Sequence, residues 1–140
     1  MKARNKTQII ILTHGNWGEE LIESVELIIG KIEAVKAFPL MAEESIESYV
    51  NNINTFINSI KEETPLILTD TFGGTPFQVA CTLVAAHDNV YSINGLSMDM
   101  LLAADKLRKQ YSGKELVYEI IKSSYKSIVD IKELFRSIDS

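Results

Sequence analysis

Short apolar segments alternate with segments of helical periodicity along the chain, and this alternation most constrains the fold. Residues 9–12 read Ile-Ile-Ile-Leu without polar alternation, as in a strand that is buried on both faces. The next segment, Gly18–Ile29, carries apolar residues at helical spacing and is followed by Gly30 as a stop signal. Strand and helix repeat in this way four times. The sequence therefore predicts an α/β fold with a mainly parallel sheet and helices on both faces.

The predicted elements follow one another without a linker, an internal repeat or a low-complexity segment, so residues 1–140 are expected to form one domain. Strands are predicted at Thr7–Thr13, Ala34–Leu40, Pro65–Thr69 and Asn89–Ile93, with a last short strand at Ser127–Ile131. Helices are predicted at Gly18–Ile29, Glu43–Ile60, Thr75–Ala86, Met98–Leu107 and Gly113–Lys126.

Composition narrows the class of protein. The chain has 140 residues, of which 46% are apolar and 24% are charged, as expected of a globular domain with its own core. A net charge of −5 argues against nucleic-acid binding, which requires a clustered basic surface. No apolar run could span a bilayer, no secretory signal is visible, and the single cysteine, Cys81, cannot form an internal disulfide. The cytoplasm is the expected compartment.

Two polar residues stand where predicted strands end. In an open α/β sheet the working site lies beyond the carboxyl ends of the strands, where the strand order reverses. For a chain of this size the common order is 2-1-3-4, which places the end of the first strand beside the end of the third. His14 follows the first of these strands and Asp70 follows the third. We therefore expect His14 and Asp70 to meet at one crevice.

The residues around this crevice favour chemistry on a histidine. A carboxylate that accepts a hydrogen bond from one ring nitrogen fixes the tautomer and leaves the other nitrogen as a nucleophile. After Asp70, Gly73 and Gly74 allow an anion to approach the backbone, and Thr75 is placed to cap the next helix. Gly15 opens a second loop beside His14. Together these features predict a histidine that becomes phosphorylated.

Three segments carry a family resemblance: IILTHGNWGEELIESVELIIG, LILTDTFGGTPFQVA and NGLSMDMLLAA. They resemble the IIA component of the mannose, fructose and sorbose family of the phosphoenolpyruvate-dependent sugar phosphotransferase system. The resemblance implies a cytoplasmic phosphotransferase that works through a phosphohistidine. No cofactor is expected, and no metal either, because no cysteine–histidine cluster has the spacing of metal ligands. His14 would take a phosphoryl group from the phosphocarrier protein HPr and pass it to a IIB component, while IIC and IID components carry the sugar across the membrane.

The same resemblance implies roles for further residues. Asp70 would orient His14, the hydroxyl of Thr75 would lie near the phosphoryl group, and the glycines Gly15, Gly73 and Gly74 would bind phosphate. The fold implied is a parallel sheet with an additional antiparallel edge strand that is exchanged between the subunits of a homodimer. Ser127–Ile131 is the candidate for that strand. The chain departs from the family pattern at Asp99, where the family usually has proline.

Other residues have less specific signals. The expected partner-docking surface consists of Trp17, Phe72, Met98 and Asp99, although Trp17 could equally be a core residue and methionines such as Met98 are more often core than recognition residues. Cys81 is expected in the core, and His87, after the third helix, is expected to be structural.

Three other functions were weighed against the phosphocarrier. The strongest is a receiver-like signalling domain phosphorylated on Asp70, which would need an acidic pair after the first strand to hold magnesium. His14 and Gly15 stand there instead. A hydrolase would need a nucleophile elbow, and no Gly-x-Ser-x-Gly is present. A dinucleotide-binding module would need Gly-x-Gly-x-x-Gly in the first turn, which is also missing.

Overall fold

A computed structural model describes residues 6–60 and 63–139. Strands and helices alternate through most of this range, as the sequence predicts. In chain order the elements are β1 (Lys6–His14), α1 (Trp17–Ile29), β2 (Val35–Leu40), α2 (Ile46–Ser59), β3 (Glu63–Thr69), α3 (Thr75–Ala86), β4 (Tyr91–Asn94), α4 (Met98–Leu107), α5 (Gly113–Lys126) and α6 (Ile131–Asp139).

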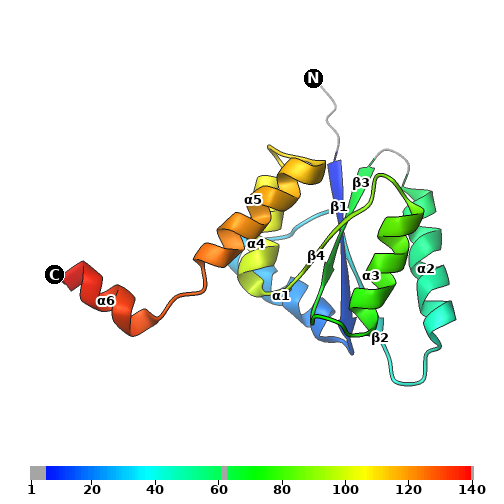
Figure 1. The fold of residues 1–140 in the computed structure, drawn as a ribbon, viewed down its shortest axis with the longest axis horizontal. Helices are drawn as coiled ribbons and strands as arrows, with labels where there is room; N and C mark the ends of the chain where they lie inside the picture. Colours follow the sequence, from blue (N-terminus) through cyan, green and yellow to red (C-terminus); the bar gives the residue numbers. More distant parts are fainter. Residues whose placement is uncertain (1–5, 61–62, 140) are drawn as a thin grey trace.

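The strands form one parallel sheet in the order β2-β1-β3-β4. The predicted order is therefore confirmed. Helices α2 and α3 cover one face of the sheet, and α1, α4 and α5 cover the other (Figure 1). The order reverses between β1 and β3, so the carboxyl ends of these two strands lie side by side, which is where an open α/β sheet places its site.

The core is divided by the central strand β1. Ile9 and Ile11 pack into the cluster under α1, α4 and α5, whereas Ile10 and Leu12 pack into the cluster under α2 and α3. All four side chains are fully buried. This arrangement explains why the strand lacks polar alternation, since a strand covered on both faces has no solvent side.

The bounds of some elements differ from the predictions. Strand β1 continues through His14, which pairs with Leu40 of β2, although the sequence predicted an end at Thr13. Strand β2 begins at Val35 because Ala34 has a φ of 54°, outside the strand conformation. Strand β4 ends at Asn94, one residue later than predicted. The extension of β1 matters most, because it holds the backbone of His14 in the sheet.

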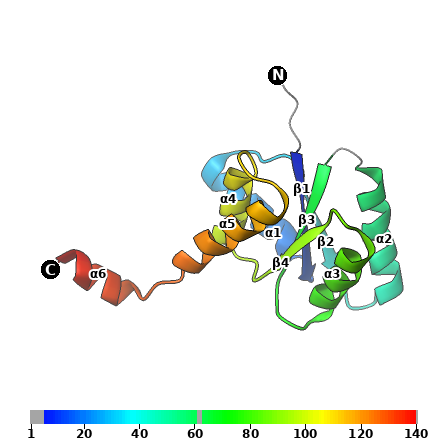
Figure 2. The ribbon, with the colours of Figure 1, turned by 45° about the horizontal axis from the view of Figure 1, so that its top comes forward.

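The described chain forms no strand at Ser127–Ile131. Residues 127–130 are irregular, and Ile131 begins α6, which extends away from the sheet and the other helices (Figures 1 and 2). The sequence carries a signal for this helix, because Asp130 is followed three residues later by Glu133. Oδ1 of Asp130 accepts a hydrogen bond from the backbone amide of Glu133 at 3.1 Å. Apolar residues recur at helical spacing and are exposed at Ile131, Leu134, Phe135 and Ile138.

Two single-residue predictions had different outcomes. Cys81 is exposed, so the prediction of a core cysteine was wrong. The buried face of α3 is formed instead by Pro76, Val79, Ala80 and Leu83. His87 has the expected structural role, because it ends α3 and its Nε2 lies 2.7 Å from Oδ1 of Asn54 on α2.

The helices were also compared with the requirements of a membrane span. In the part of the chain that the structure describes, no helix combines the length and the apolar character needed to cross a bilayer.

Close packing of α1 on β1 depends on Gly18. A Cβ atom at Gly18 would lie 3.0 Å from Cγ2 of Ile11 and 3.1 Å from Cγ2 of Thr13. Both neighbours belong to the buried central strand, so they have little room to move. The missing side chain therefore lets the first turn of α1 approach β1 close to His14.

We predict that Gly18→Val lowers the free energy of unfolding by about 1–3 kcal/mol, because the added side chain overpacks this contact. Urea denaturation measures the change. The matched control is Glu19→Val, which places the same side chain at the next, exposed position of α1 and should cost less than about 1 kcal/mol. Equal losses in the two variants would contradict the proposed contact.

Candidate functional site

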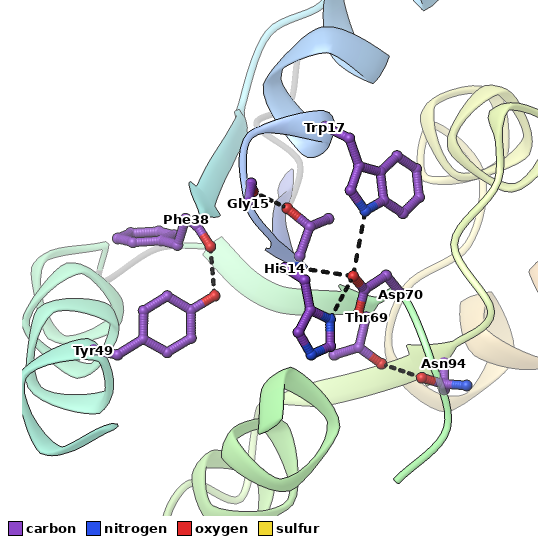
Figure 3. A network of polar contacts seen from close by, with 9 residues as sticks. His14, Gly15, Trp17, Phe38, Tyr49, Thr69, Asp70 and Asn94 are labelled. Carbon is purple, nitrogen blue, oxygen red and sulfur yellow. Dashed lines mark hydrogen bonds and ion pairs between the residues drawn. The ribbon is translucent and has the colours of Figure 1, made fainter. Parts of the chain in front are cut away.

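His14 and Asp70 meet at the carboxyl end of the sheet, as the sequence predicts. Nδ1 of His14 lies 3.0 Å from Oδ2 of Asp70, and the backbone amide of His14 donates to the same oxygen at 2.8 Å (Figure 3). The His14 side chain is 50% exposed, whereas that of Asp70 is 6% exposed. The carboxylate thus fixes both the backbone and the ring of a histidine that solvent and partners can reach.

Trp17 supplies a further donor to Asp70. Its indole Nε1 donates to Oδ2 of Asp70 at 3.3 Å. The sequence favours Trp17 in the core or at a docking surface and does not predict this bond. The position of Trp17 in the first turn of the helix after His14 could have indicated this hydrogen bond. It brings the indole N–H close to the carboxylate of Asp70, and a buried carboxylate accepts such hydrogen bonds.

The surroundings of Asp70 favour its ionised form. Burial of the carboxylate raises the pKa of Asp70, but the opposing contributions are together larger. These are the hydrogen bonds from the backbone and ring of His14, the charge of that ring, and the hydrogen bond from Trp17. The pKa of Asp70 therefore lies below its usual range. Its other oxygen, Oδ1, is buried and has no hydrogen-bond partner among the described residues.

An ionised Asp70 determines which ring nitrogen of His14 carries the proton. Since a carboxylate only accepts hydrogen bonds, Nδ1 must be the protonated nitrogen. Nε2 is then the nitrogen with a free lone pair. It faces Gly74, where a Cβ atom would lie 3.3 Å from Nε2 and 2.9 Å from Cε1 of the ring. The potential nucleophile therefore lies against the backbone that begins α3.

The glycines after Asp70 form a tight turn into α3. The amide of Gly74 donates to the carbonyl oxygen of Thr71 at 3.4 Å, and Gly73 adopts a φ of 81°, which favours glycine. Gly74 is the N-cap residue, and Thr75 is the first helical residue, so the prediction that Thr75 caps α3 was wrong by one position. Position 74 needs glycine, because a side chain there would collide with the His14 ring.

Helix starts around His14 differ in their caps. Ser45 caps α2 by accepting from the amide of Ser48, and Ser97 caps α4 by accepting from the amide of Met100. By contrast, none of the described side chains caps α1 or α3, the two helices that begin next to His14. In the first turn of α3, Pro76 has no amide hydrogen but the amide of Thr75 has no intrahelical acceptor, whereas at the start of α1 the amide of Glu19 already donates to the carbonyl oxygen of Asn16 at 3.0 Å. The amide of Thr75 and the positive ends of the two helix dipoles therefore favour an anion beside Nε2.

Gly15 turns the chain at the end of β1. Its φ of 69° turns the chain from β1 toward α1, and its amide donates to the carbonyl oxygen of Leu40 at 2.9 Å. Thr13 completes the turn by donating from Oγ1 to the carbonyl oxygen of Gly15 at 2.8 Å. The amide hydrogen of Gly15 is therefore already used within the fold.

The residues predicted for partner docking are exposed. Phe72 is 81% exposed at the turn before α3, and Trp17 is 40% exposed at the start of α1. Met98, in the first turn of α4, is 36% exposed, and its neighbour Asp99 is also exposed. All four residues predicted for partner docking therefore lie at the surface, and the core alternative for Trp17 and Met98 is ruled out.

Comparisons with known proteins agree with this arrangement. A family model described as "PTS system fructose IIA component" matches residues 8–121. The chain is 27% identical over 115 residues to the sorbose-specific EIIA component of Lacticaseibacillus casei, covering 82% of this chain and 83% of that protein. It is 29% identical over 120 residues to the fructose-specific EIIA component of Bacillus subtilis, covering 85% and 82%.

The fold comparison gives the same result. The crystal structure of a phosphotransferase system component EIIA from Streptococcus agalactiae superposes with a TM-score of 0.83 at 32% identity, covering 91% of this chain and 98% of that one. Since the family model spans most of the chain, the chain belongs to the family of PTS fructose IIA components. The resemblance identified from the sequence motifs is thereby confirmed.

The lowered pKa of Asp70 predicts how stability depends on pH. A carboxyl group whose pKa is lower in the folded state stabilises the fold above its ordinary pKa of about 3.9, and this contribution is lost as the pH falls through the folded value. The free energy of unfolding of the wild type, minus that of Asp70→Asn, should therefore shrink as the pH falls below about 4.

Urea denaturation at a series of pH values measures this difference. His14→Ala serves as a comparison, because it removes one donor to Asp70 and should move the decline toward higher pH. A difference that stays constant through the acid range would show that Asp70 gains no stabilisation from its ionised form.

Proposed function

We propose that this chain is a IIA phosphocarrier of a sugar phosphotransferase system, in which Nε2 of His14 carries the phosphoryl group. HPr is the proposed donor and a IIB component the proposed acceptor, with IIC and IID components moving the sugar. The observation that carries the proposal is the geometry of His14. Its Nδ1 is fixed by Asp70 at 3.0 Å, and its Nε2 faces the uncapped start of α3.

The proposed step exchanges one phosphorus–nitrogen bond for another. The lone pair of Nε2 forms a bond to the phosphorus of phospho-HPr, the donor's phosphorus–nitrogen bond breaks, and that electron pair returns to the donor ring. His14 keeps its proton on Nδ1, so its ring gains positive charge during the transfer. The ionised carboxylate of Asp70 stabilises this charge. Transfer to the IIB component reverses the same bond changes.

The phosphoryl oxygens need donors close to Nε2. We assign them to the backbone at the start of α3, where Gly73 and Gly74 allow close approach and where the amide of Thr75 has no intrahelical acceptor. The hydroxyl of Thr75 is a further candidate donor. The start of α1 adds a second helix dipole on the same side of His14. The amide of Gly15 is not proposed as a donor to the phosphoryl oxygens, because it already donates to the carbonyl oxygen of Leu40.

Partner docking is assigned to the exposed residues around His14. Trp17, Phe72 and Met98 provide apolar contact area, and adaptable methionine suits a surface that must meet a donor and an acceptor in turn. Asp99, in place of the usual proline, would favour basic partner residues. These partners imply a cytoplasmic location. We also propose that residues 1–140 act as one domain.

The receiver-like alternative is not supported. Asp70 would then be the phosphoryl acceptor, but its Oδ2 already accepts from three donors and its side chain is 6% exposed. At the end of β1, where a receiver holds magnesium with acidic residues, the chain has His14 and Gly15. The relatives that the chain matches are EIIA components.

The phosphorylated residue can be tested directly. We predict that phospho-HPr labels the wild type and that His14→Ala takes no label while still unfolding cooperatively, because the His14 ring is not part of the core. The label should be lost in mild acid, which turns the ring into a good leaving group, and kept in dilute base. Intact-mass spectrometry after mild-acid or dilute-base treatment gives both results. A label on His14→Ala, or one lost in dilute base, would favour Asp70 instead.

The close approach of Gly74 to His14 predicts a strong effect of a single methyl group. Gly74→Ala would place its Cβ 2.9 Å from Cε1 of His14 and displace the ring. Phosphoryl acceptance should slow by about 100-fold. The backbone of Gly74 has φ −76° and ψ −180°, which alanine adopts without strain, so the free energy of unfolding should change by less than about 1 kcal/mol. Single-turnover labelling and urea denaturation test the two parts, and an unchanged labelling rate would contradict them.

We also propose that the chain is a homodimer in which the segment after α5 pairs with the partner subunit's sheet. Two features of the single chain support this proposal. Ile128 is 82% exposed and Val129 is 49% exposed in a segment that extends away from the sheet (Figure 2). Strand β4 is an edge strand, because none of the described residues pairs with its outer side. A second copy that exchanges this segment would cover the exposed apolar side chains and the open edge of β4.

Sedimentation of a chain truncated after Lys126 tests this proposal. We expect the wild type to be a dimer at micromolar concentration and the truncated chain to be a monomer. In the full chain, Ile128→Asp should weaken dimerisation, whereas Ile128→Val keeps a β-branched apolar side chain and should not. A truncated chain that still dimerises would place the interface elsewhere.

A further inference from the structure

Asn94 ends β4 opposite Thr69, the last residue of β3. Its side chain does not reach His14 or Asp70 but lies next to the Thr69 hydroxyl, with 2.7 Å between Oγ1 and the amide (Figure 3). A hydroxyl donates or accepts, so this contact forms with either end of the amide toward Thr69. The remaining neighbours of Asn94 decide which end faces it.

Only one orientation of the amide pairs all of its polar atoms. With the nitrogen toward Thr69, it donates to Oγ1 of Thr69 at 2.7 Å and to the carbonyl oxygen of Thr71 at 3.1 Å. The oxygen then accepts from the backbone amides of Phe72 at 3.2 Å and of Gly95 at 3.3 Å. One side chain from β4 therefore binds the backbone of the chain on both sides of the peptide bond between Thr71 and Phe72.

These bonds act on the turn that borders the His14 ring. The carbonyl oxygen of Thr71 that accepts from Asn94 also accepts from the amide of Gly74, and this bond closes the turn into α3. Gly74 in turn lies against Nε2 and Cε1 of His14. Asn94 is thus connected to the ring through Thr71 and Gly74, although it does not touch the ring.

The other end of the connection is firmly held. The backbone amides of Gly95 and Leu96 both donate to the carbonyl oxygen of Thr69 at 3.0 Å, which fixes the end of β4 to the end of β3. Thr69 itself is 1% exposed. Asn94 therefore joins an exposed turn to a rigid part of the sheet.

We propose that Asn94 is a positioning residue for phosphoryl transfer: it holds the turn from Thr71 to Gly74 so that the first amides of α3 face Nε2 of His14. This inference rests on the proposed function of His14. We call the hydrogen bonds from the Asn94 side chain to Thr71 and Phe72 the clamp. Without the clamp, the turn can move relative to the His14 ring. The phosphoryl oxygens then lose part of their donors during the transfer, while the His14–Asp70 pair remains intact.

Ser92 provides a matched control on the same strand. Its Oγ donates to the carbonyl oxygen of Ile67 at 2.9 Å, so Ser92→Ala also removes a side-chain hydrogen bond between β4 and β3. That bond is two residues away from Asn94 and does not involve the turn. Loss of stability alone would affect both variants, whereas loss of positioning would affect only Asn94→Ala.

The test measures single-turnover labelling at saturating phospho-HPr, so that docking does not limit the rate. Asn94→Ala should slow the transfer roughly 10- to 100-fold, whereas Ser92→Ala should stay within about twofold of the wild type. Amide hydrogen exchange provides the second measurement. The Phe72 amide should be protected in the wild type and in Ser92→Ala, although its side chain is exposed, and should exchange faster in Asn94→Ala.

Two results would overturn the proposal. One is a labelling rate for Asn94→Ala equal to that of Ser92→Ala. The other is an unprotected Phe72 amide in the wild type, which would show that the clamp does not form. This measurement is made on the wild type, so it does not require Asn94→Ala to fold correctly. If the wild type takes no label from phospho-HPr, the proposed function fails and the role of Asn94 in transfer fails with it. Hydrogen exchange would still show whether the clamp itself exists.

Discussion

One oxygen atom, Oδ2 of Asp70, holds the site together. It accepts from the backbone and ring of His14 and from the indole of Trp17, and so it joins the ends of β1 and β3 to the start of α1. Burying a carboxylate is unfavourable unless enough donors compensate for the lost water, and here three donors do so. The same hydrogen bonds that stabilise the buried charge fix the tautomer of an exposed imidazole.

The surrounding backbone complements this fixed ring. Helices α2 and α4 have serine caps, whereas among the described residues no side chain caps α1 or α3 beside His14, or α5. Beside His14, the lack of a cap leaves the start of α3 open to an anion. Gly74 allows contact with the ring, and Asn94 holds the turn that contains it. We infer that the donors for a phosphoryl group are positioned before the group arrives, which is how electrostatic stabilisation is most effective.

Local patterns in the sequence determined much of this arrangement. The unbroken apolar run of β1 indicated a doubly covered strand, and the strand order then brought His14 and Asp70 together. Contacts between distant segments were harder to predict. Asn94 lies 25 positions from Thr69, its hydrogen-bonding partner, and nothing in its neighbourhood in the sequence indicates that contact. The cap of α3 was misplaced because the contact of Gly74 with His14 is tertiary, and α6 was missed although Asp130 and Glu133 carry a helix-start pattern.

The central claim is that Asp70 reserves Nδ1 for a proton and leaves Nε2 for the phosphoryl group. NMR of the protein with ¹⁵N-labelled histidine, recorded before and after reaction with phospho-HPr, measures this claim most directly, because the two ring nitrogens give separate signals. The geometry predicts coupling of phosphorus to Nε2, with Nδ1 still protonated and hydrogen-bonded to Asp70. Coupling of phosphorus to Nδ1 would contradict it, because that nitrogen would then have to leave the carboxylate on which the site depends.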